Sequence, residues 1–388
     1  MKKIDVKFTN ELTNDEIRQW NSLNSSDEKG RVYSSIEWLE MVEKSDGIAQ
    51  QIVLLKENNT ILMGMTFDLM PKNAPKQYNL DELLKGNSEY IDSKIPLKNM
   101  NNSYMPSVVF TARASRSYDI RYSKNLTTKD DLDDCFKLIY NFIFNKYCED
   151  YNITFLYVPE NNVILRRNLE SLKLDKYAIT GSYYKKIDYI DFSEYLDEYP
   201  SKKRSKIKNE INNLKNSEYE VIESELIDNL DKYVELVGMN FKKYGFPNFN
   251  FHSYKERMEL LNHSFKGRSK LLNIQDQEGN IVASALYIIQ DQVMHARGVG
   301  VDYGKSPKNI APYFNIVYYE GIKKAIDIGA SYFVVGDGLD KVKISRKMDL
   351  EKLFIYTNEN SAEFKGNMKL INQYSENKFE DLFHGKKD

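Results

Sequence analysis

Four basic residues follow a glycine turn near the C-terminal end of the chain, and they are its strongest candidates for chemistry. The turn is Gly336–Gly338, and the cations are Lys341, Lys343, Arg346 and Lys347. Acyl transfer to an amine needs a proton acceptor near the amine and positive charge near the tetrahedral oxygen. We expect Asp337 to bind an amine and take its proton, and Lys343 and Arg346 to hold a phosphate or carboxylate. The alternatives are a carboxylate that caps the turn and a solvated basic loop.

Weaker candidates lie on the segment before this turn. His295, on the run VMHARGVGV, is a general base if it points into a cleft and a core histidine otherwise. Arg297, Tyr313 and Tyr319 are candidates for substrate binding, although most of the 28 tyrosines must be packing residues. The sequence contains no legible Ser-His-Asp or Cys-His arrangement. We therefore expect direct attack by the amine rather than a covalent acyl-enzyme.

A helix and a buried strand must position these residues. Apolar residues recur at helical spacing from Pro312 to Ile328, and Gly329 is suited to the end of that helix. The next run, Tyr332–Val335, is short and rich in β-formers, which is typical of a central strand. This order predicts a site at the C-terminal edge of a sheet, where open α/β sheets hold ligands.

Two other basic segments are candidates for binding anions. Arg113, Arg116 and Arg121 crowd together in the first half, either as an anion pocket on the same cleft or as surface residues paired with acids. Residues 201–215 form a predicted helix with six cations and one acid, Glu210, a local charge of +5. That helix could hold the phosphates of tRNA, a pantetheine-bearing cofactor or an acidic carrier protein. The alternative is a solvated helix face.

Composition limits the classes of partner. The 388 residues are 41% hydrophobic and carry a net charge of −2, which gives no overall attraction to DNA or membranes. Two cysteines and four histidines show no metal-ligand spacing, so neither a metal nor a tightly bound cofactor is expected. The sequence contains neither an apolar signal segment nor a run of about 18 apolar residues that could span a bilayer. These features predict a soluble, cytoplasmic protein.

The same order of predicted elements occurs in both halves: two helices, a hairpin, a strand, a helix and a strand. The hairpin turns are Glu57–Asn59 and Glu278–Asn280. We therefore predict two similar α/β domains. The predicted boundaries are 1–190 for the N-terminal domain, 191–218 for the basic connecting helix, 219–360 for a C-terminal domain with the active site, and 361–388 for a polar tail that frays.

This order resembles the GNAT superfamily of acetyltransferases. The similarity is sharpest over S-x-K-R-x-x-I-x-x-E at Ser201–Glu210, DKYVELVGMNFKKYGFP at Asp231–Pro247 and F-x-x-x-YY-x-GI-x-x-AI at Phe314–Ile326. Together, over roughly residues 30–357, these stretches look like predicted N-acyltransferases labelled Fem-like or peptidoglycan-biosynthesis proteins. The resemblance implies an α/β (α+β) fold with two tandem GNAT-like domains, each a mixed sheet flanked by helices.

The resemblance also implies roles for particular residues. Lys343 and Arg346 match a K-x-x-R pattern that follows the strand after the long helix in that family. Gly298 and Val299 would expose strand amides to an acyl-pantetheine arm. The glycine-rich loop of CoA-using members is replaced by Gly304–Asn309, where Pro307 removes one amide from a pyrophosphate site. This departure leaves a phosphopantetheine arm on a carrier protein, or an aminoacyl-tRNA, as the open alternatives to acetyl-CoA.

The sequence thus predicts an N-acyltransferase. It would form an amide between an acyl or aminoacyl donor, activated as a thioester on CoA or a carrier protein, and a small amine or amino acid, as in natural product biosynthesis. One alternative is a Fem-type aminoacyl-tRNA-dependent transferase that acts on a cell-wall precursor or a natural-product intermediate. Another is a non-catalytic binding protein with a GNAT fold. A carrier protein or tRNA is expected to bind at residues 201–215.

Overall fold

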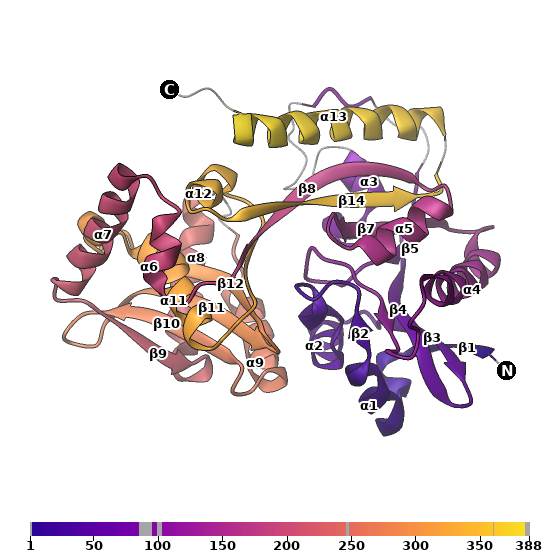
Figure 1. Ribbon diagram of the computed structural model, residues 1–388, viewed down its shortest axis with the longest axis horizontal. Coiled ribbons are helices and arrows are strands. Elements are labelled where there is room, and N and C mark those ends of the chain that lie inside the picture. Colours follow the sequence, from indigo (N-terminus) through magenta and orange to yellow (C-terminus); the bar gives the residue numbers. More distant parts are fainter. Residues whose placement is uncertain (1, 85–94, 99–102, 246–247, 360, 385–388) are drawn as a thin grey trace. The chain divides into compact units, whose positions relative to one another are not determined.

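The computed structural model describes residues 2–84, 95–98, 103–245, 248–359 and 361–384 (Figure 1). Contacts divide the chain into two compact units. Unit 1 is Met1–Ser182 with Leu350–Asp388, and unit 2 is Tyr183–Asp349. Each unit contains a mixed sheet flanked by helices. The predicted α/β fold, with mixed sheets flanked by helices, is therefore confirmed.

Unit 1 contains a sheet with the strand order β1-β3-β4-β5-β7-β14-β8, and β2 and β6 form a side pair. Strands β5 and β7 are parallel, whereas β7 and β14 are antiparallel. Its strands are β1 Lys2–Phe8, β2 Asn24–Ser25, β3 Gln51–Glu57, β4 Thr60–Met70, β5 Ser107–Phe110, β6 Arg121–Tyr122, β7 Asn152–Pro159, the first part of β8 Asp175–Lys186, and β14 Asp349–Thr357. Its helices are α1 Asn14–Ser22, α2 Ile36–Asp46, α3 Leu80–Leu84, α4 Lys129–Tyr147, α5 Val163–Ser171 and α13 Ala362–His384.

Alternate residues of the central strands of unit 1 belong to two different cores. Phe110 on β5 and Phe155 on β7 stack at 4.2 Å between ring centroids and pack with the buried face of α4. Their neighbours Val109 and Leu156 belong to the core that contains α3 and α13. Because successive strand residues point to opposite faces, this sheet is covered by helices on both sides.

Unit 2 contains a sheet with the strand order β8-β13-β12-β11-β10-β9. Only the last residues of β8, from Tyr183, belong to this unit. The pair β12–β13 is parallel, and the other pairs are antiparallel. Its strands are β9 Glu220–Glu225, β10 Ser269–Gln275, β11 Ile281–Gln290, β12 Val293–Val301 and β13 Tyr332–Gly336. Its helices are α6 Phe192–Asp197, α7 Ser201–Lys215, α8 Leu230–Lys243, α9 Phe251–Ser264, α10 Pro312–Phe314, α11 Glu320–Asp327 and α12 Asp340–Ser345.

The helix predicted from Pro312 to Ile328 is present, but a π-helical turn at Asn315–Tyr319 separates α10 from α11. Tyr287 on β11 donates a hydrogen bond to the carbonyl oxygen of Ile316 at 2.5 Å and lies 3.3 Å from that of Val317. This hydroxyl satisfies carbonyls that the wider turn leaves exposed. Gly329 follows with φ +65°, and β13 occupies the predicted strand.

Two sequence-based expectations about the chain ends are corrected. Residues 350–359, which the predicted C-terminal domain (219–360) included, belong to unit 1, where β14 pairs with β7. Residues 362–384 of the tail that was expected to fray form α13, which runs along β8 and β14 (Figure 1) and buries Phe364, Met368 and Ile371. The predicted boundaries at 190, 218 and 360 therefore differ from the observed division at 182 and 349.

Within the described residues, no helix combines the length and apolar character that a bilayer crossing requires.

Candidate active site

A pocket of about 190 Å³ lies in unit 2. Its polar lining comes from Arg297, Asp337 and Lys343, together with the rings of Tyr313 and Tyr318. The remaining lining residues are small or aliphatic: Ala285, Ala296, Gly298, Val299, Val317, Val335 and Leu339. A small apolar chamber with a few convergent polar groups is the usual composition of a small-molecule site.

The pocket follows the paired segment of β12 and β13. Parallel pairs run from Val293 with Tyr332 to His295 with Val334, and the pocket-lining residues of both strands come directly after these pairs. On the other side of β12, Ala296 lies opposite Tyr287 and Gly298 lies opposite Leu286, so Arg297 is the extra residue of a β-bulge. A bulge bends its strand and changes the direction of a side chain, which explains how Ala296, Arg297 and Gly298 all line one pocket.

Lys343 fixes the turn that carries Asp337. Its Nζ atom donates hydrogen bonds to the carbonyl oxygens of Val335, at 2.8 Å, and Asp337, at 2.5 Å. The lysine is only 4% exposed, and it lies on α12, where the sequence predicted a basic loop. Gly336 and Gly338 have φ values of +66° and +71°, so the predicted sharp glycine turn is present. The ammonium group thus holds both the end of β13 and the turn in place.

These groups can perform the chemistry that acyl transfer requires. The half-buried Asp337 carboxylate can bind an ammonium group and accept a proton from it. Cations at Lys343 and Arg297 can stabilise negative charge on a carbonyl oxygen, and such stabilisation is strong where water is largely excluded. Burial raises the pKa of the Tyr313 hydroxyl, so this group stays a neutral hydrogen-bond donor at physiological pH.

Arg346 is not part of the pocket lining and instead joins three elements of unit 2. Its guanidinium carbon lies 3.9 Å from the ring centroid of Phe314, and its Nη2 atom lies 3.3 Å from Oε2 of Glu210 on α7. The hydroxyl of Tyr319 donates to the same Glu210 oxygen. Arg346 is only 2% exposed, and its carbonyl oxygen accepts a hydrogen bond from Tyr195 at 2.8 Å. These contacts argue for a structural role rather than for holding a donor phosphate.

Replacing Arg346 with methionine should lower the free energy of unfolding by about 3 kcal/mol, because the mostly buried Glu210 carboxylate loses its buried cation and keeps only the exposed Lys206, 4.0 Å away. Adding Glu210→Gln to this variant should restore part of the loss, since the buried charge is then removed. Urea denaturation of both variants checks this expectation. Lys347→Met, at the exposed neighbouring position, is the control. If Arg346→Met lowers turnover while leaving stability unchanged, the structural assignment of Arg346 is wrong.

A family model described as FemAB-like, peptidoglycan biosynthesis/recognition, matches residues 125–352, which is more than half of the chain. The chain belongs to the FemAB-like family. The family expected from the resemblance is therefore confirmed. A comparison with curated proteins found no match to this FemAB-like chain.

Solved structures share the fold of the FemAB-like chain at low sequence identity. FemX matches with a TM-score of 0.60 and 11% identity, covering 91% of this chain and 96% of FemX. A conserved protein of unknown function from Bacteroides thetaiotaomicron matches with a TM-score of 0.53 and 14% identity, over 92% and 100%. The C-terminal domain of a putative lysylphosphatidylglycerol synthetase from Agrobacterium fabrum matches with a TM-score of 0.50 and 9% identity, over 81% and 85%.

Several residues predicted for the site of this FemAB-like chain come together, and others do not. Asp337, Lys343, Arg297, Gly298, Val299 and Tyr313 all line the pocket. Tyr319 is fully buried and bonded to Glu210. His295 is buried at the last β12–β13 pair, and burial, followed by the charge of Arg297, lowers its pKa to about 3. A base with this pKa cannot retain a proton at neutral pH, which favours the core alternative for His295.

The arginines of the first half lie in unit 1, whereas the pocket belongs to unit 2. Arg113 is 1% exposed and donates to the Gln50 side chain at 3.2 Å and to the Ile48 carbonyl at 2.6 Å. Its Nε atom also lies 3.5 Å from a carboxylate oxygen of the buried Asp68. The side chain of Arg116 is half-buried. Because Nε and Nη2 of Arg113 both bind internal oxygens, these contacts favour an internal role for Arg113 over the expected anion pocket.

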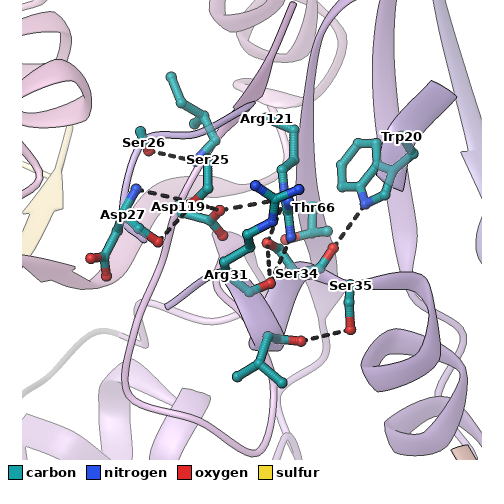
Figure 2. A network of polar contacts seen from close by, with 12 residues as sticks. Trp20, Ser25, Ser26, Asp27, Arg31, Ser34, Ser35, Thr66, Asp119 and Arg121 are labelled. Carbon is teal, nitrogen blue, oxygen red and sulfur yellow. Dashed lines mark hydrogen bonds and ion pairs between the residues drawn. The ribbon is translucent and has the colours of Figure 1, made fainter. Parts of the chain in front are cut away.

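Arg121 has a similar internal role, and Figure 2 shows its surroundings. It donates to the hydroxyl of Ser34 at 2.8 Å and to the carbonyl of Arg31 at 2.6 Å, and it lies 3.5 Å from the Asp119 carboxylate. The Ser25 hydroxyl donates to the same carboxylate. All of these groups stabilise the loops around β2 and β6.

The apolar side of the pocket was not predicted from the sequence. Four residues on this side have the pattern of ordinary core positions in a strand pair and a helix: Ala285, Ala296, Val317 and Tyr318. One signal was available, because β11 and β12 carry small residues, Ala285, Ala296 and Gly298, at positions that line the pocket. The bulge at Arg297 left no such signal.

Proposed function

We propose that this chain is an aminoacyltransferase that forms an amide bond. In this reaction the amine of an acceptor attacks the carbonyl carbon of an activated aminoacyl group. The observation that carries the proposal is the pocket in unit 2, where one carboxylate and two cations lie against a small apolar floor. The lining residues, all in described parts of the chain, include neither serine nor cysteine, which supports direct attack.

The steps follow from the pocket residues. Asp337 binds the acceptor as an ammonium and takes one proton, which leaves a neutral amine. Attack produces a tetrahedral oxygen with negative charge, which Lys343 and Arg297 stabilise. Collapse of this intermediate breaks the bond between the carbonyl carbon and the leaving oxygen of the donor. The leaving oxygen takes a proton from the positively charged attacking nitrogen and departs as a hydroxyl, which gives the neutral amide, and Asp337 returns its proton to solvent. The small side chains of Ala285, Ala296 and Val317 favour a small acyl group over a long chain.

The loop before α10 argues against CoA as the donor. The Asp302 carboxylate accepts hydrogen bonds from the backbone amides of Gly304, at 3.0 Å, and Lys305, at 3.2 Å. A pyrophosphate would need such amides, and it would also be repelled by this carboxylate. Pro312 has no amide at the first position of α10. These features support an aminoacyl ester of tRNA over a thioester of CoA.

The basic helix α7 supports the same donor. Lys202, Lys206, Lys208 and Lys215 are all exposed along it. The helix is tied to the loop before α10 by a 3.1 Å hydrogen bond from Asn213 to the carbonyl of Asn309. Cations that follow one helix are suited to the phosphates of an RNA backbone. The family description suggests an amine of a peptidoglycan precursor as the acceptor.

The test compares donors directly. The full chain is incubated with tRNA carrying mixed radiolabelled amino acids, or with labelled acetyl-CoA, and with a lysine-containing muramyl pentapeptide as the acceptor. We expect label to reach the peptide from tRNA alone. Added uncharged tRNA should raise the melting temperature, since a ligand at about 100 times its dissociation constant stabilises by about 2.7 kcal/mol. Transfer from acetyl-CoA would refute the donor assignment, and binding of tRNA without any transfer would favour the non-catalytic alternative.

A further inference from the structure

Five aromatic side chains gather where α8 ends and α9 begins. Phe241 stacks on Phe249 at 4.9 Å, and Phe249 contacts Phe251 edge to face at 4.9 Å. The amine of Lys243 lies 5.5 Å from the ring centroid of Tyr244 and 3.4 Å from that of Tyr303. The amine of Lys242 lies 5.1 Å from the ring centroid of Phe251. These residues are called the aromatic patch: Phe241, Tyr244, Phe249, Phe251 and Tyr303, with the flanking lysines 242 and 243.

Much of the aromatic patch is open to solvent. Tyr244 is 55% exposed, Tyr303 is 41% exposed, and Phe241 and Phe251 are nearly as exposed as Tyr303. Scattered apolar side chains are common on protein surfaces, but a contiguous group with aligned cations marks a binding surface. Burying these rings against a ligand would release ordered water and gain stacking energy.

A glycine inside α8 lies under the aromatic patch and makes the helix less stable. Gly238 lies inside α8, where glycine is about 0.5–1 kcal/mol less favourable than alanine. A Cβ atom at this position would lie 2.4 Å from Cε1 of Phe251 and 3.0 Å from Cδ1 of Phe249. A side chain at residue 238 would therefore displace both rings. The glycine allows Phe249 and Phe251 to lie directly on the helix.

The aromatic patch is continuous with the pocket in two ways. Tyr303 follows β12 by two residues, and burial, then the nearby Tyr244 and Tyr313, raise its pKa to about 12. Tyr313 in turn lines the pocket. Phe249 also contacts Tyr254 at 5.1 Å, and the Tyr254 hydroxyl lies 3.2 Å from that of Tyr233. Both hydroxyls lie beside the pocket residue Gly298, where an added Cβ atom would be 2.4 Å from the Tyr233 hydroxyl. A ligand that extends from the pocket can thus reach the aromatic patch.

We propose that the aromatic patch binds the nucleotide that an activated acyl donor carries next to its acyl group. The inference rests on the proposed aminoacyl transfer. A nucleobase stacks on the exposed rings, and the adjacent phosphates meet Lys242 and Lys243. The rings are suited to the base of a nucleotide, and the lysines are suited to its phosphate. In an aminoacyl ester of tRNA only a ribose separates the acyl group from adenine, which suits a patch that adjoins the pocket.

Binding of unacylated ligands to the full chain tests this inference without turnover. The probes are an RNA oligonucleotide ending in CCA, CoA, and vesicles containing anionic phosphatidylglycerol, measured by calorimetry at one salt concentration. We expect the oligonucleotide to bind more tightly than CoA. Tyr303→Ala should weaken oligonucleotide binding at least about fivefold, given the stacking energy of a single base. Tyr303→Phe should retain binding because the ring remains.

Ile190→Ala, which removes an exposed apolar side chain between β8 and α6, is the control and should change nothing. Equal melting temperatures would show that each variant is folded. Oligonucleotide and CoA affinities unchanged by Tyr303→Ala would overturn the inference, as would vesicle binding that depends on Tyr303 in place of oligonucleotide binding. Tighter binding of CoA through Tyr303 would also overturn the inference, because the pantetheine arm separates the nucleotide of CoA from its acyl group.

The inference and the proposed function can fail separately. If label is transferred from tRNA but Tyr303→Ala leaves binding and KM unchanged, the patch assignment fails and the transferase assignment stands. If Tyr303 controls nucleotide binding but no donor is turned over, the transferase assignment fails and the patch stands.

Discussion

Replacing Lys343 with methionine should lower kcat by about 100- to 1,000-fold, the effect of removing one donor to a developing oxyanion. Methionine has a similar length, so the change removes the charge and the hydrogen bonds while filling most of the space. Two effects combine, because Lys343 lines the pocket and also holds the carbonyls of Val335 and Asp337. Loss of the second function would let the Asp337 turn move. Steady-state kinetics with saturating aminoacyl-tRNA measures the loss.

The control for Lys343 is available two residues away. Lys341 is an exposed lysine on the same helix, α12, so Lys341→Met should retain full activity. Unfolding free energies are needed for both variants, since loss of the two carbonyl contacts should destabilise Lys343→Met by about 1–3 kcal/mol. Activity close to that of the unmodified chain at a temperature where Lys343→Met is folded would remove this residue from the mechanism.

Removing charge from the exposed side of α7 should weaken tRNA binding and reduce its dependence on salt. The variant replaces Lys202, Lys208 and Lys215 with alanine, all of which are exposed. Each lost phosphate contact lowers the slope of log affinity against log salt by about 0.7–0.9, so three contacts should lower it by about 2–3. Arg204 is left in place because it pairs with Asp197, and Lys203 because it lies near Arg346. Filter binding from 50 mM salt upward measures both quantities.

A matched control separates local contacts from overall charge. Lys124, Lys129 and Lys137 are exposed lysines of unit 1, and replacing them with alanine changes the net charge equally. We expect a smaller change of slope for this control variant. If both triple variants bind tRNA alike, the basic helix has no specific role in tRNA binding.

Local patterns in the sequence determined most of the elements that carry the site. The periodicity from Pro312 to Ile328, the glycine at 329 and the β-rich run after it correctly predicted α10 to α11 and β13. The predicted turn at Gly336–Gly338 also appears, with positive φ at both glycines. Such features depend on neighbours within a few residues, which is why spacing and residue type are sufficient.

The roles of the predicted cations depended on partners far away in the sequence. From the sequence, Arg346 was expected to hold a phosphate, but in the structure it contacts Glu210, which lies 136 residues earlier. Arg113 was likewise expected in an anion pocket, but its Nε atom contacts Gln50 and Asp68. A charged side chain shows in the sequence that it needs a partner, but only packing decides whether that partner is a ligand or another part of the chain.

Neither the pairing partner of β14 nor the shape of the pocket could be predicted from the sequence. The residue types of Asp349–Thr357 predict a strand, but its partner β7 lies about 200 residues earlier, and no local rule selects that partner. The bulge at Arg297 and the π turn at Asn315–Tyr319 depend on neighbouring backbone and on the Tyr287 hydroxyl. Sequence therefore determined the elements and the acid and lysine of the candidate site, whereas tertiary packing decided which side chains reach the pocket, because orientation is set by contacts between distant segments.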